Sequence, residues 1–522
     1  MTDEQVRNAA ASGIAEVIAR HAQASPDRPF LITGDGRLSY RDADEGARDV
    51  AAALLAAGIR DGDRVAVAAP NCAEWILLWL GTARIGAVLV TLNVVYREQE
   101  FEYMLGQSGA RLLVCSAHAR GHDFVAMLDG MRDRIPGVER IVYLGEEGAA
   151  DEAGAATWQG FLAGAAEAAL PGPATGTAPA VILYTSGTTG APKGAVLTHG
   201  GIMASAAGEA ARFELTRDDV ILGHMPLNHV GGLTCTVASA AVAGAAVALL
   251  PGFHPEQSLD AAARTRATLL VGVPTMYSLM VDGAGGRDLS AVRLCVVGGA
   301  NLEPALAERM REAFAGTRIA NLYGASEASG ACIVSAPGDG PELLRTSIGT
   351  PLDGVEVRIV TPDGAPAAPG ADGELQVRAP SVAAGYWDMP EATAAAFLPG
   401  GWLATGDVAT LADDGHVTLR GRLKEMYVRG GYNVYPAEVE NFVGGLPGVA
   451  MVAVVGVPSE LYGETGRAFV VPAPGAEVVP EEVRERCRSA FAAYKVPDEV
   501  IVVDSLPLTP AGKIRKAVLP RD

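Results

Sequence analysis

Apolar runs of strand length alternate with amphipathic segments of helical length through the first three hundred residues. A helix is predicted near the N-terminus, then a small hairpin (30–33 and 38–40) and a second helix through Val50 and Leu55. The strand-like runs that follow are 64–68, 88–90, 111–114, 140–143, 267–271 and 294–297. Continuous apolar strands separated by helices, such as the one over 73–85, are typical of a sheet covered by helices. The pattern therefore predicts an α/β fold.

The pattern changes twice towards the C-terminus. After Gly340 the strands become shorter and are separated by turns rich in Gly, Pro and Asp, as in 355–360 followed by 361–364, which predicts a β-rich subdomain. After Gly421 the chain carries its own set of apolar segments: 439–443, 451–455, 467–471, 481–493 and 500–503. We predict two domains: a large one over 1–421, with helix-flanked sheets and the β-rich subdomain, and a small α+β one over 422–522.

Two stretches depart from this alternation. Residues 225–253 carry no charge and are long enough to span a bilayer. They contain Pro226, Asn228 and His229, and their apolar residues are mostly Ala, so we predict a buried helix followed by a strand over 246–250. Residues 145–177 are rich in Ala, Gly and acidic residues and are predicted to form a surface insertion.

Composition narrows the class of protein. A chain of 522 residues exceeds one ordinary core, and 49% hydrophobic with 20% charged residues is typical of a packed globular protein. The net charge of −20 argues against a nucleic-acid surface or an acidic membrane as partner. Six single cysteines without a C-x-x-C pair, and an N-terminus without the order of a signal peptide, lead us to expect a cytoplasmic protein without disulfides.

The stretch YTSGTTGAPKG, over 184–194, has the residue types that hold a polyphosphate. Its glycines expose backbone N–H groups, its hydroxyls add donors and Lys193 adds a positive charge. A P-loop needs Gly before the lysine and Ser or Thr after it, whereas here Pro192 precedes Lys193 and Gly194 follows. The stretch therefore joins two predicted strands, 180–183 and 195–198. A flexible linker is the alternative for such a composition.

This string resembles, almost letter for letter, the phosphate-binding signature of the adenylate-forming superfamily. That superfamily includes acyl-CoA synthetases, non-ribosomal peptide adenylation domains and luciferases. The resemblance extends over about 38–516, with the other signatures in family order. It implies an ATP-dependent acyl-CoA synthetase. A carboxylic acid and ATP would give acyl-AMP and pyrophosphate, and coenzyme A would then take the acyl group and release AMP. It also implies a C-terminal domain that moves about a hinge, and ATP, Mg²⁺ and coenzyme A as cosubstrates and cofactor.

A second segment, NLYGASE over 321–327, follows a predicted short strand at 318–320. An aromatic ring can stack on a purine, and a carboxylate is a suitable ligand for Mg²⁺. The segment matches the family's Y-G-x-[ST]-E signature, which implies adenine stacking by Tyr323 and metal ligation by Glu327. Its G-A-S-E-A core is also close to the G-x-S-x-G elbow of hydrolases. The only later histidine is His416, in a predicted turn, which speaks against that alternative.

Three further segments complete the resemblance. In 401–407 and 421–425, Asp407 and Arg422 match the ribose-binding pair and Lys424 the hinge; a carboxylate suits two vicinal hydroxyls. Residues 430–436 resemble the glycine loop that approaches the pantetheine arm of coenzyme A, although a plain turn would share this composition. That loop assigns coenzyme A binding to Gly430, Gly431 and Tyr432. Lys513, in PLTPAGK over 507–513, matches the catalytic lysine, for which the ordinary alternative is a surface charge.

The residues that the resemblance assigns to the nucleotide are Thr185, Ser186, Gly187, Thr188, Thr189, Gly190, Lys193, Gly299, Ala300, Asn321, Tyr323, Gly324, Ser326, Asp407, Arg422 and Lys513. Lys513, Glu327 and Thr185 are the expected catalytic residues, and Glu327 and Thr185 the expected metal ligands. A mobile cation between the two reacting anions is what the chemistry of phosphoryl transfer favours.

The sequence defines the identity of the carboxylic acid substrate less well than the reaction. Amino-acid-activating relatives carry an aspartate in the segment that matches 226–232, where this chain has no carboxylate, so a non-amino acid is expected. His229 matches the gate of acyl and aryl ligases, although a lone histidine can equally be a core residue. The small residues Gly231, Gly298 and Gly299 leave room for a medium-to-long or bulky acyl group.

Expected partners are therefore a small carboxylic acid, ATP and coenzyme A, with no nucleic acid and no membrane span, in a monomer or homodimer. Loading of an acyl group onto a carrier protein is the alternative reaction. A nucleotide-binding protein without catalysis is disfavoured by the presence of both Glu327 and Lys513.

Overall fold

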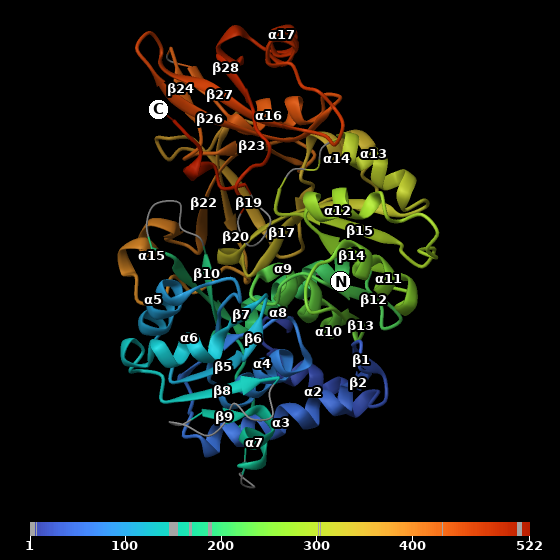
Figure 1. The fold of residues 1–522 in the computed structure, drawn as a ribbon, viewed down its shortest axis with the longest axis vertical. Coiled ribbons are helices and arrows are strands. Elements are labelled where there is room, and N and C mark those ends of the chain that lie inside the picture. Colours follow the sequence, from blue (N-terminus) through green and yellow to red (C-terminus); the bar gives the residue numbers. More distant parts are fainter. Residues whose placement is uncertain are drawn as a thin grey trace.

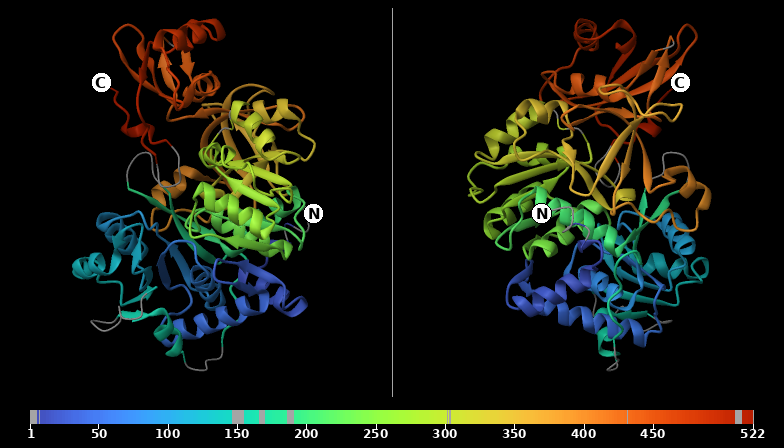
Figure 2. Two further views of the ribbon diagram at one scale, coloured as in Figure 1. Left: turned by 45° about the vertical axis from the view of Figure 1, so that its right-hand side comes forward. Right: turned by 180° about the vertical axis from the view of Figure 1, so that it is seen from behind.

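A computed structural model describes residues 6, 8–145, 155–165, 170–185, 191–300, 302, 304–430, 432–508 and 514–521. It has a large body containing two mixed sheets and a β-rich subdomain, with a smaller C-terminal domain at one end (Figure 1). In both views of Figure 2 this C-terminal domain, orange to red, lies at the end of the molecule opposite the dark blue N-terminal helices. The predicted α/β class with a separate α+β C-terminal domain is confirmed.

The first sheet has the strand order β11-β10-β4-β3-β5-β8-β9. All neighbours are parallel except β10 and β11, which form an antiparallel pair at one edge. The strands are β3 (Arg64–Ala68), β4 (Val88–Thr91), β5 (Leu112–Ser116), β8 (Arg140–Leu144), β9 (Ala155–Thr157), β10 (Pro179–Thr185) and β11 (Lys193–Thr198). The predicted strand-to-strand connection around the phosphate loop is therefore confirmed.

Two helices beside the first sheet show why apolar periodicity located them. The helix α3 (Tyr40–Ala56) begins with a capping box, because Ser39 Oγ accepts from Asp42 N and Asp42 accepts from Ser39 N. The helix α4 (Ala73–Ile85) is apolar on nearly all sides because it is buried, with both Trp75 and Trp79 in the core. The others are α2 (Ile14–Ala24), α5 (Glu98–Ser108), α6 (Phe124–Gly130) and α7 (Trp158–Ala163).

The prediction of a surface insertion over 145–177 is wrong for its middle part. There, β9 adds a parallel edge strand to β8, and α7 buries Trp158 and Phe161. An edge strand of three small residues has no apolar run to mark it, which is why composition suggested a loop instead.

The second sheet has the order β18-β17-β16-β15-β14-β12-β13-β1-β2. Its strands are β1 (Pro29–Ile32), β2 (Arg37–Ser39), β12 (Val220–Gly223), β13 (Ala246–Leu249), β14 (Leu269–Gly272), β15 (Leu294–Gly298), β16 (Arg318–Ala325), β17 (Gly330–Val334) and β18 (Thr350–Pro351). Its helices are α8 (His199–Arg212), α11 (Pro255–Thr265), α12 (Pro274–Val281), α13 (Pro304–Ala313) and α14 (Pro341–Thr346). The strand β16 extends to Ala325, so most of the 321–327 segment lies on a strand and not after one.

The uncharged stretch 225–253 is buried, as predicted. It forms α9 (Val230–Gly232), a π-helix (Leu233–Ala238) and α10 (Ser239–Ala243), followed by β13. Among the described residues, no helix is both long enough and apolar enough to cross a membrane.

The β-rich subdomain consists of β19 (Glu356–Val360), β20 (Gly373–Arg378), β21 (Phe397–Leu398), β22 (Trp402–Leu411) and β23 (Val417–Arg422), with α15 (Pro390–Ala396) beside it. The C-terminal domain has its own sheet of β24 (Tyr427–Arg429), β25 (Tyr432–Val434), β26 (Val449–Ser459), β27 (Gly463–Pro472) and β28 (Glu499–Val502). The helices α16 (Pro436–Gly444) and α17 (Pro480–Ala490) pack on this sheet around a separate hydrophobic core.

Candidate active site

Tyr323, Asp407 and Arg422 come together between the second sheet and the β-rich subdomain. The Tyr323 hydroxyl donates to Asp407 Oδ2 at 2.6 Å, and Arg422 Nε lies 3.1 Å from Asp407 Oδ1. Asp407 and Arg422 face each other across the β22–β23 hairpin, whose Asp414-Gly415 turn sets their register. The carboxylate is only 7% exposed, so its hydrogen-bond partners largely fix its orientation.

Electrostatics couple these three groups. Burial, and then the neighbouring Asp407 carboxylate, hold the pKa of the Tyr323 hydroxyl well above its ordinary value. The same carboxylate raises the pKa of Arg422. Tyr323 therefore remains a hydrogen-bond donor and Arg422 a cation. The cluster has an exposed positive group and an oriented carboxylate side by side, which suits a sugar hydroxyl pair next to a phosphate.

A second cluster lies where the phosphate loop leaves and re-enters the first sheet. Thr185 and Lys193 pair across β10 and β11, and Thr185 Oγ1 lies 3.4 Å from the Lys193 carbonyl oxygen. The Lys193 ammonium lies 5.0 Å from the centre of the Tyr386 ring. Tyr386 in turn donates its hydroxyl to Glu327 Oε1 at 2.8 Å. Tyr386 thus connects the cation of the loop with the expected metal ligand.

Backbone pairing explains how Tyr386 reaches this position. Residues 383–387 run antiparallel along β11, where Val196 N donates to the Gly385 carbonyl and Trp387 N to the Gly194 carbonyl. Ala383 N also donates to the backbone carbonyl of Glu327 at 2.8 Å. The edge of the first sheet and the end of β16 are therefore held together by this segment.

The chemistry of these donors fits a magnesium ion of the nucleotide-bound type. Among the described residues, no group of three or more His, Cys, Asp or Glu side chains could hold a metal. Mg²⁺ typically takes one or two carboxylates and completes its shell with water and substrate phosphates. Tyr386 bonds Glu327 through Oε1, and the hydroxyl of Thr185 lies on the strand end next to the loop. Glu327 and Thr185 could therefore hold Mg²⁺ together with a triphosphate.

Other expected nucleotide residues are placed around β15 and β16. Gly299 adopts a positive φ of 79° directly after β15, and both Gly299 and Ala300 are exposed. Gly298 lies against Leu322, and Ser326 opens a short 3₁₀ helix next to Glu327. A side chain on Gly324 would lie 2.1 Å from the Gly330 carbonyl oxygen, so only glycine fits there.

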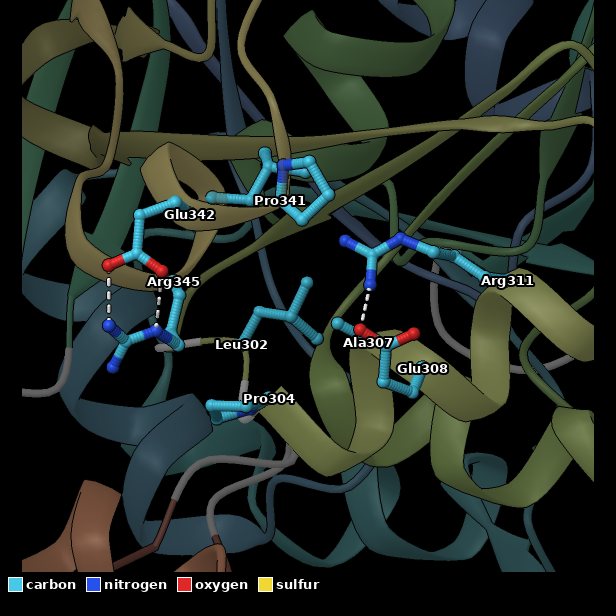
Figure 3. Close-up of a pocket in the computed structure, with 9 residues that line it drawn as sticks. Leu302, Pro304, Ala307, Glu308, Arg311, Pro341, Glu342 and Arg345 are labelled. Atoms are coloured by element: carbon cyan, nitrogen blue, oxygen red, sulfur yellow. Dashed lines mark hydrogen bonds and ion pairs between the residues drawn. The ribbon is translucent and has the colours of Figure 1, made fainter.

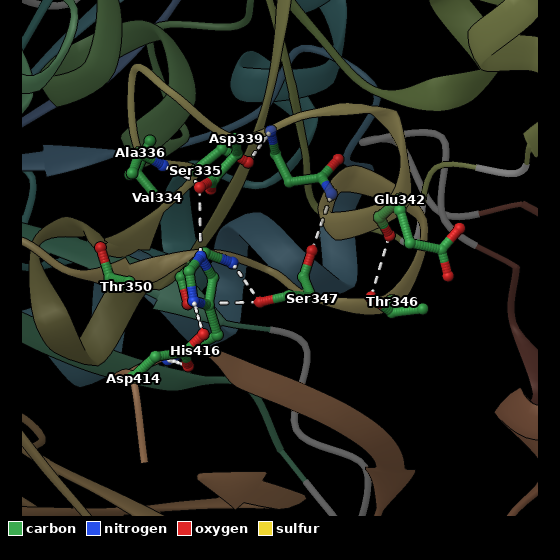
Figure 4. A network of polar contacts seen from close by, with 12 residues as sticks. Val334, Ser335, Ala336, Asp339, Glu342, Thr346, Ser347, Thr350, Asp414 and His416 are labelled. Carbon is green, nitrogen blue, oxygen red and sulfur yellow. Dashed lines mark hydrogen bonds and ion pairs between the residues drawn. The ribbon is translucent and has the colours of Figure 1, made fainter. Parts of the chain in front are cut away.

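Asn321 has a different environment from the others. Its side-chain amide donates to the carbonyls of Leu344 and Ser347, and it is only 8% exposed. Its backbone N–H donates to Ser335 Oγ at 2.9 Å. Figure 4 shows the polar network to which Ser335 belongs, in which Ser347 and the His416–Asp339 ion pair join α14 and the β22–β23 turn. The structure thus gives Asn321 a supporting position behind Tyr323. His416, the histidine weighed for a hydrolase, is occupied by Asp339 and Asp414.

A pocket between α13 and α14 adds no further site (Figure 3). Its charged side chains are already paired within the pocket, Glu308 with Arg311 and Glu342 with Arg345.

The expected acyl gate lies on α9. His229 caps this helix, with Nδ1 accepting from Gly231 N at 3.1 Å, and is half-buried. Gly231 packs closely on Met225, and a side chain at Gly232 would collide with the Pro226 carbonyl. These glycines let α9 lie close to the preceding loop, and the π-helix follows directly.

In the C-terminal domain, Gly430 adopts a positive φ of 57° and its N–H donates to the Tyr462 carbonyl. Tyr432 is 59% exposed and stacks on Tyr494, with ring centres 4.6 Å apart. Lys424 is exposed between β23 and β24. The structure brings neither Lys424 nor Tyr432 into contact with the Tyr323–Asp407–Arg422 cluster.

Seven of the expected site residues lie outside the described residues: Ser186, Gly187, Thr188, Thr189, Gly190, Gly431 and Lys513. Beside the last of these, Leu508 pairs with Ile514, and Lys516 Nζ bonds both Glu425 at 2.7 Å and Glu440 at 2.8 Å.

Sequence reasoning missed two residues to which the structure gives defined polar contacts: Tyr386 at the second cluster and Lys516 between Glu425 and Glu440. Tyr386 lies on the connection between β20 and α15, and its only signal was an aromatic residue between Gly385 and Trp387. Lys516 was visible only as one more cation near the C-terminus. The positions of Tyr386 and Lys516 depend on contacts with distant segments of the chain, which no local sequence pattern predicts.

This arrangement of two mixed sheets, a hydroxyl-rich loop, a tyrosine–carboxylate–arginine cluster and a separate C-terminal domain defines an adenylate-forming enzyme. Comparisons agree with it. The family model for the AMP-binding enzyme matches residues 18–387, and that for the AMP-binding enzyme C-terminal domain matches 438–513. The chain belongs to the AMP-binding enzyme family, within the adenylate-forming superfamily.

Relatives define the branch of this family. The chain is 36% identical over 501 residues to 3-[(3aS,4S,7aS)-7a-methyl-1,5-dioxo-octahydro-1H-inden-4-yl]propanoyl:CoA ligase of Mycobacterium tuberculosis (strain ATCC 25618 / H37Rv), covering 95% of this chain and 96% of that protein. It is also 36% identical over 513 residues to feruloyl-CoA synthase of Amycolatopsis sp, covering 98% and 99%. The anthranilate CoA ligase AuaEII, solved with anthranoyl-AMP, superimposes with a TM-score of 0.88 at 28% identity, covering 97% and 96%.

The predicted function is therefore confirmed at the level of reaction class. The protein is an AMP-forming acid–thiol ligase, an acyl-CoA synthetase that uses ATP and coenzyme A and proceeds through an acyl-adenylate.

Proposed function

We propose that this acyl-CoA synthetase activates a bulky carboxylic acid without an amino group. The observation that carries the proposal is the α9 segment, where 226–232 offers His229 and two glycines and no carboxylate that could pair with a substrate ammonium. The names of the two relatives are in line with it, because one describes a bicyclic propanoate and the other ferulate.

In the proposed first half-reaction, the residues form three groups around ATP. Tyr323 stacks on the adenine, and Asp407 and Arg422 hold the ribose. The hydrogen bond from Tyr323 and the ion pair with Arg422 orient the Asp407 carboxylate before ATP binds. Gly299, Ala300, Gly324 and Ser326 frame the base and the α-phosphate, and Asn321 supports Tyr323 from behind through its bonds to the Leu344 and Ser347 carbonyls. The loop of 185–190 with Lys193 holds the β- and γ-phosphates. Mg²⁺, when bound by Glu327, Thr185 and the triphosphate, would neutralise phosphate charge.

Lys513 is proposed to complete this half-reaction from the C-terminal domain. The acid's carboxylate attacks the α-phosphorus, its oxygen forms the new P–O bond, and pyrophosphate leaves with the bonding electron pair. Both reactants are anions, so a cation between them lowers the barrier. His229, Gly231, Gly298 and Gly299 are proposed to hold the acyl group beside this centre.

The second half-reaction is assigned to a different face of the same domain. The boundary predicted between 421 and 422 falls one residue short of the end of β23, so we place it after Arg422, with the hinge at Lys424, which is exposed between β23 and β24. A rotation there would withdraw Lys513 and present Gly430, Gly431 and Tyr432 to the pantetheine arm. The thiol of coenzyme A then attacks the acyl carbonyl and AMP leaves. A cytoplasmic location suits six cysteines that are all free.

An acid screen by ATP/pyrophosphate exchange tests the proposed substrate class. Exchange with ring-bearing aryl or bicyclic acids, and none with amino acids, is expected. Exchange that depends on an amino acid would refute it. The acceptor is tested separately, by offering free coenzyme A and a phosphopantetheinylated carrier protein to the same acyl-adenylate. Thioester on coenzyme A is expected, and thioester only on the carrier would favour the alternative reaction.

A further inference from the structure

A fully buried carboxyl group, that of Glu209, lies outside the residues assigned above. It is on α8 and has no exposed surface. Its Oε1 lies 3.3 Å from Ser205 Oγ and accepts from Ala331 N at 3.3 Å, and its Oε2 lies 3.2 Å from Ser239 Oγ. Buried carboxyls are costly unless they are bonded in this way.

These contacts join three elements that each lead to a different part of the proposed site. The helix α8 follows β11 and therefore the phosphate loop. Ser239 begins α10, which continues the π-helix after the acyl gate at His229. Ala331 lies on β17 and pairs with Gly324 on β16, next to the adenine and metal residues. Figure 1 shows α8, α9 and α10 in green at the centre of the body, next to β17.

Proton counting favours the neutral form of Glu209. Ser205 Oγ lies 3.1 Å from the Ala331 carbonyl as well as near Oε1, and Ser239 Oγ lies 3.1 Å from the Thr234 carbonyl as well as near Oε2. Each hydroxyl has one hydrogen and faces two acceptors. With an ionised carboxylate, neither hydroxyl can serve both of its acceptors, although Oε1 also accepts from Ala331 N and the Thr234 carbonyl from Ser239 N. A protonated carboxyl supplies a third hydrogen and leaves one hydroxyl free to donate to its carbonyl.

The backbone is shaped to admit this group. Gly330 has a φ of 146°, and a side chain there would lie 2.6 Å from Ser205 Oγ and 3.2 Å from Glu209 Oε1. The approach of β17 to the carboxyl therefore needs glycine at this position.

The surroundings contain no competing titration near neutral pH. Burial raises the pKa of the carboxyl to about 7. The titratable groups that face it are the thiols of Cys235 on the π-helix and Cys332 on β17, and burial raises the pKa of both, that of Cys332 to about 12. Arg212, the next charged residue on α8, bonds backbone carbonyls of β17 and β18 instead.

We propose that Glu209, as a neutral carboxylic acid, is a positioning residue that clamps the π-helix behind the acyl gate to α8 and β17. The clamp rests on the proposed placement of the acid beside α9. Loss of the Glu209 proton or side chain frees the π-helix and weakens binding of the acid, while ATP, held by β16 and the β22–β23 hairpin, is bound as before.

Kinetics of ATP/pyrophosphate exchange test the clamp in the full-length enzyme. Glu209→Ala removes three hydrogen bonds, one of which holds Ser239 at the end of the π-helix. Because loss of that bond loosens the side of the acyl gate, the KM for the acid in Glu209→Ala should rise about tenfold, with the KM for ATP within about twofold of wild type. Between about pH 6.5 and about pH 8.5 the acid KM of wild type should rise and that of Glu209→Gln should stay flat. Glu214→Gln, an exposed glutamate just after α8, is the matched control and should follow wild type.

Hydrogen–deuterium exchange gives a readout that needs no substrate. After correction for intrinsic rates, the peptide over 233–239 should exchange faster at the higher pH in wild type than in Glu209→Gln, while a peptide over 294–298 should not differ. Identical exchange and identical acid-KM profiles in these two proteins would overturn the clamp, as would an equal rise of both KM values in Glu209→Ala. If no acid supports exchange in wild type, the proposed substrate class fails and the deuterium experiment still decides the clamp.

Discussion

The hydrogen bond between Tyr323 and Asp407 offers the sharpest test of the nucleotide site. Tyr323→Phe removes only the hydroxyl that donates to Asp407 Oδ2 at 2.6 Å. A hydrogen bond to a charged, buried acceptor contributes about 1.5–3 kcal/mol. If half of this is used to orient the carboxylate for the ribose, the KM for ATP should rise by about three- to tenfold, which corresponds to about 0.75–1.5 kcal/mol.

A double-mutant cycle separates this effect from general damage. Tyr323→Phe, Asp407→Ala and the double variant are compared by ATP/pyrophosphate exchange with the acid saturating. Because both changes remove the same bond, we expect a coupling energy of about 1–2 kcal/mol between them. The matched control is Tyr277→Phe, because this buried hydroxyl donates to the Leu270 and Val296 carbonyls of the same sheet. It should lower the melting temperature and leave the KM for ATP unchanged.

Two results would refute this reasoning. Additivity of Tyr323→Phe and Asp407→Ala within about 0.3–0.5 kcal/mol would show that the bond does not prepare the carboxylate for ATP. A rise in the KM for ATP in Tyr277→Phe as large as that in Tyr323→Phe would show that loss of any buried hydroxyl in this sheet has the same effect.

Three further predictions concern Lys513, Gly324 and the buried carboxyl of Glu209. Lys513→Ala should abolish acyl-adenylate formation and leave thioester formation from supplied acyl-AMP largely intact, and equal loss of both, measured by exchange and by thioester release, would contradict its role. Gly324→Ala should abolish exchange while the C-terminal domain stays folded by limited proteolysis, because its Cβ would lie 2.1 Å from the Gly330 carbonyl; wild-type exchange would contradict this. Glu209 binds its proton in the native state between its ordinary pKa of 4.5 and about 7, where the unfolded chain has lost it, so native stability falls as pH rises through that window. Glu209→Gln should therefore gain about 2–3 kcal/mol relative to wild type between about pH 5 and about pH 8 in urea unfolding, and a constant difference would contradict the neutral carboxyl.

Local sequence patterns predicted where the helices and strands of this fold lie better than they predicted which segments pair with one another. Apolar runs located β3, β4, β5 and β15, and the helix through Val50 and Leu55 is α3. The small edge strand β9 was missed because it has no apolar run. The π-helix was missed because its buried residues fit an ordinary helix equally well, and the extra residue per turn has no sequence signal.

For the candidate site too, motifs located residues, whereas the contacts of these residues depend on distant segments. The motifs located Tyr323, Asp407 and Arg422, and hairpin register brings the last two face to face. Tyr386 was beyond prediction because it reaches Glu327 only after 383–387 pairs with β11, nearly two hundred residues earlier in the chain. Asn321 was expected at the base, and the structure uses its amide to hold α14 and the following loop. Interactions between distant segments decide such roles.

Transfer of ¹⁸O from a labelled acid is the most direct test of an acyl-adenylate intermediate. This intermediate requires a carboxylate oxygen to attack the α-phosphorus and to remain on AMP when coenzyme A takes the acyl group. Reaction of ¹⁸O₂-carboxylate with ATP and coenzyme A should therefore give AMP that carries one ¹⁸O atom, acyl-CoA that keeps the other in its carbonyl group, and unlabelled pyrophosphate. Label in inorganic phosphate with formation of ADP, or acyl-CoA formed with unlabelled AMP, would contradict it.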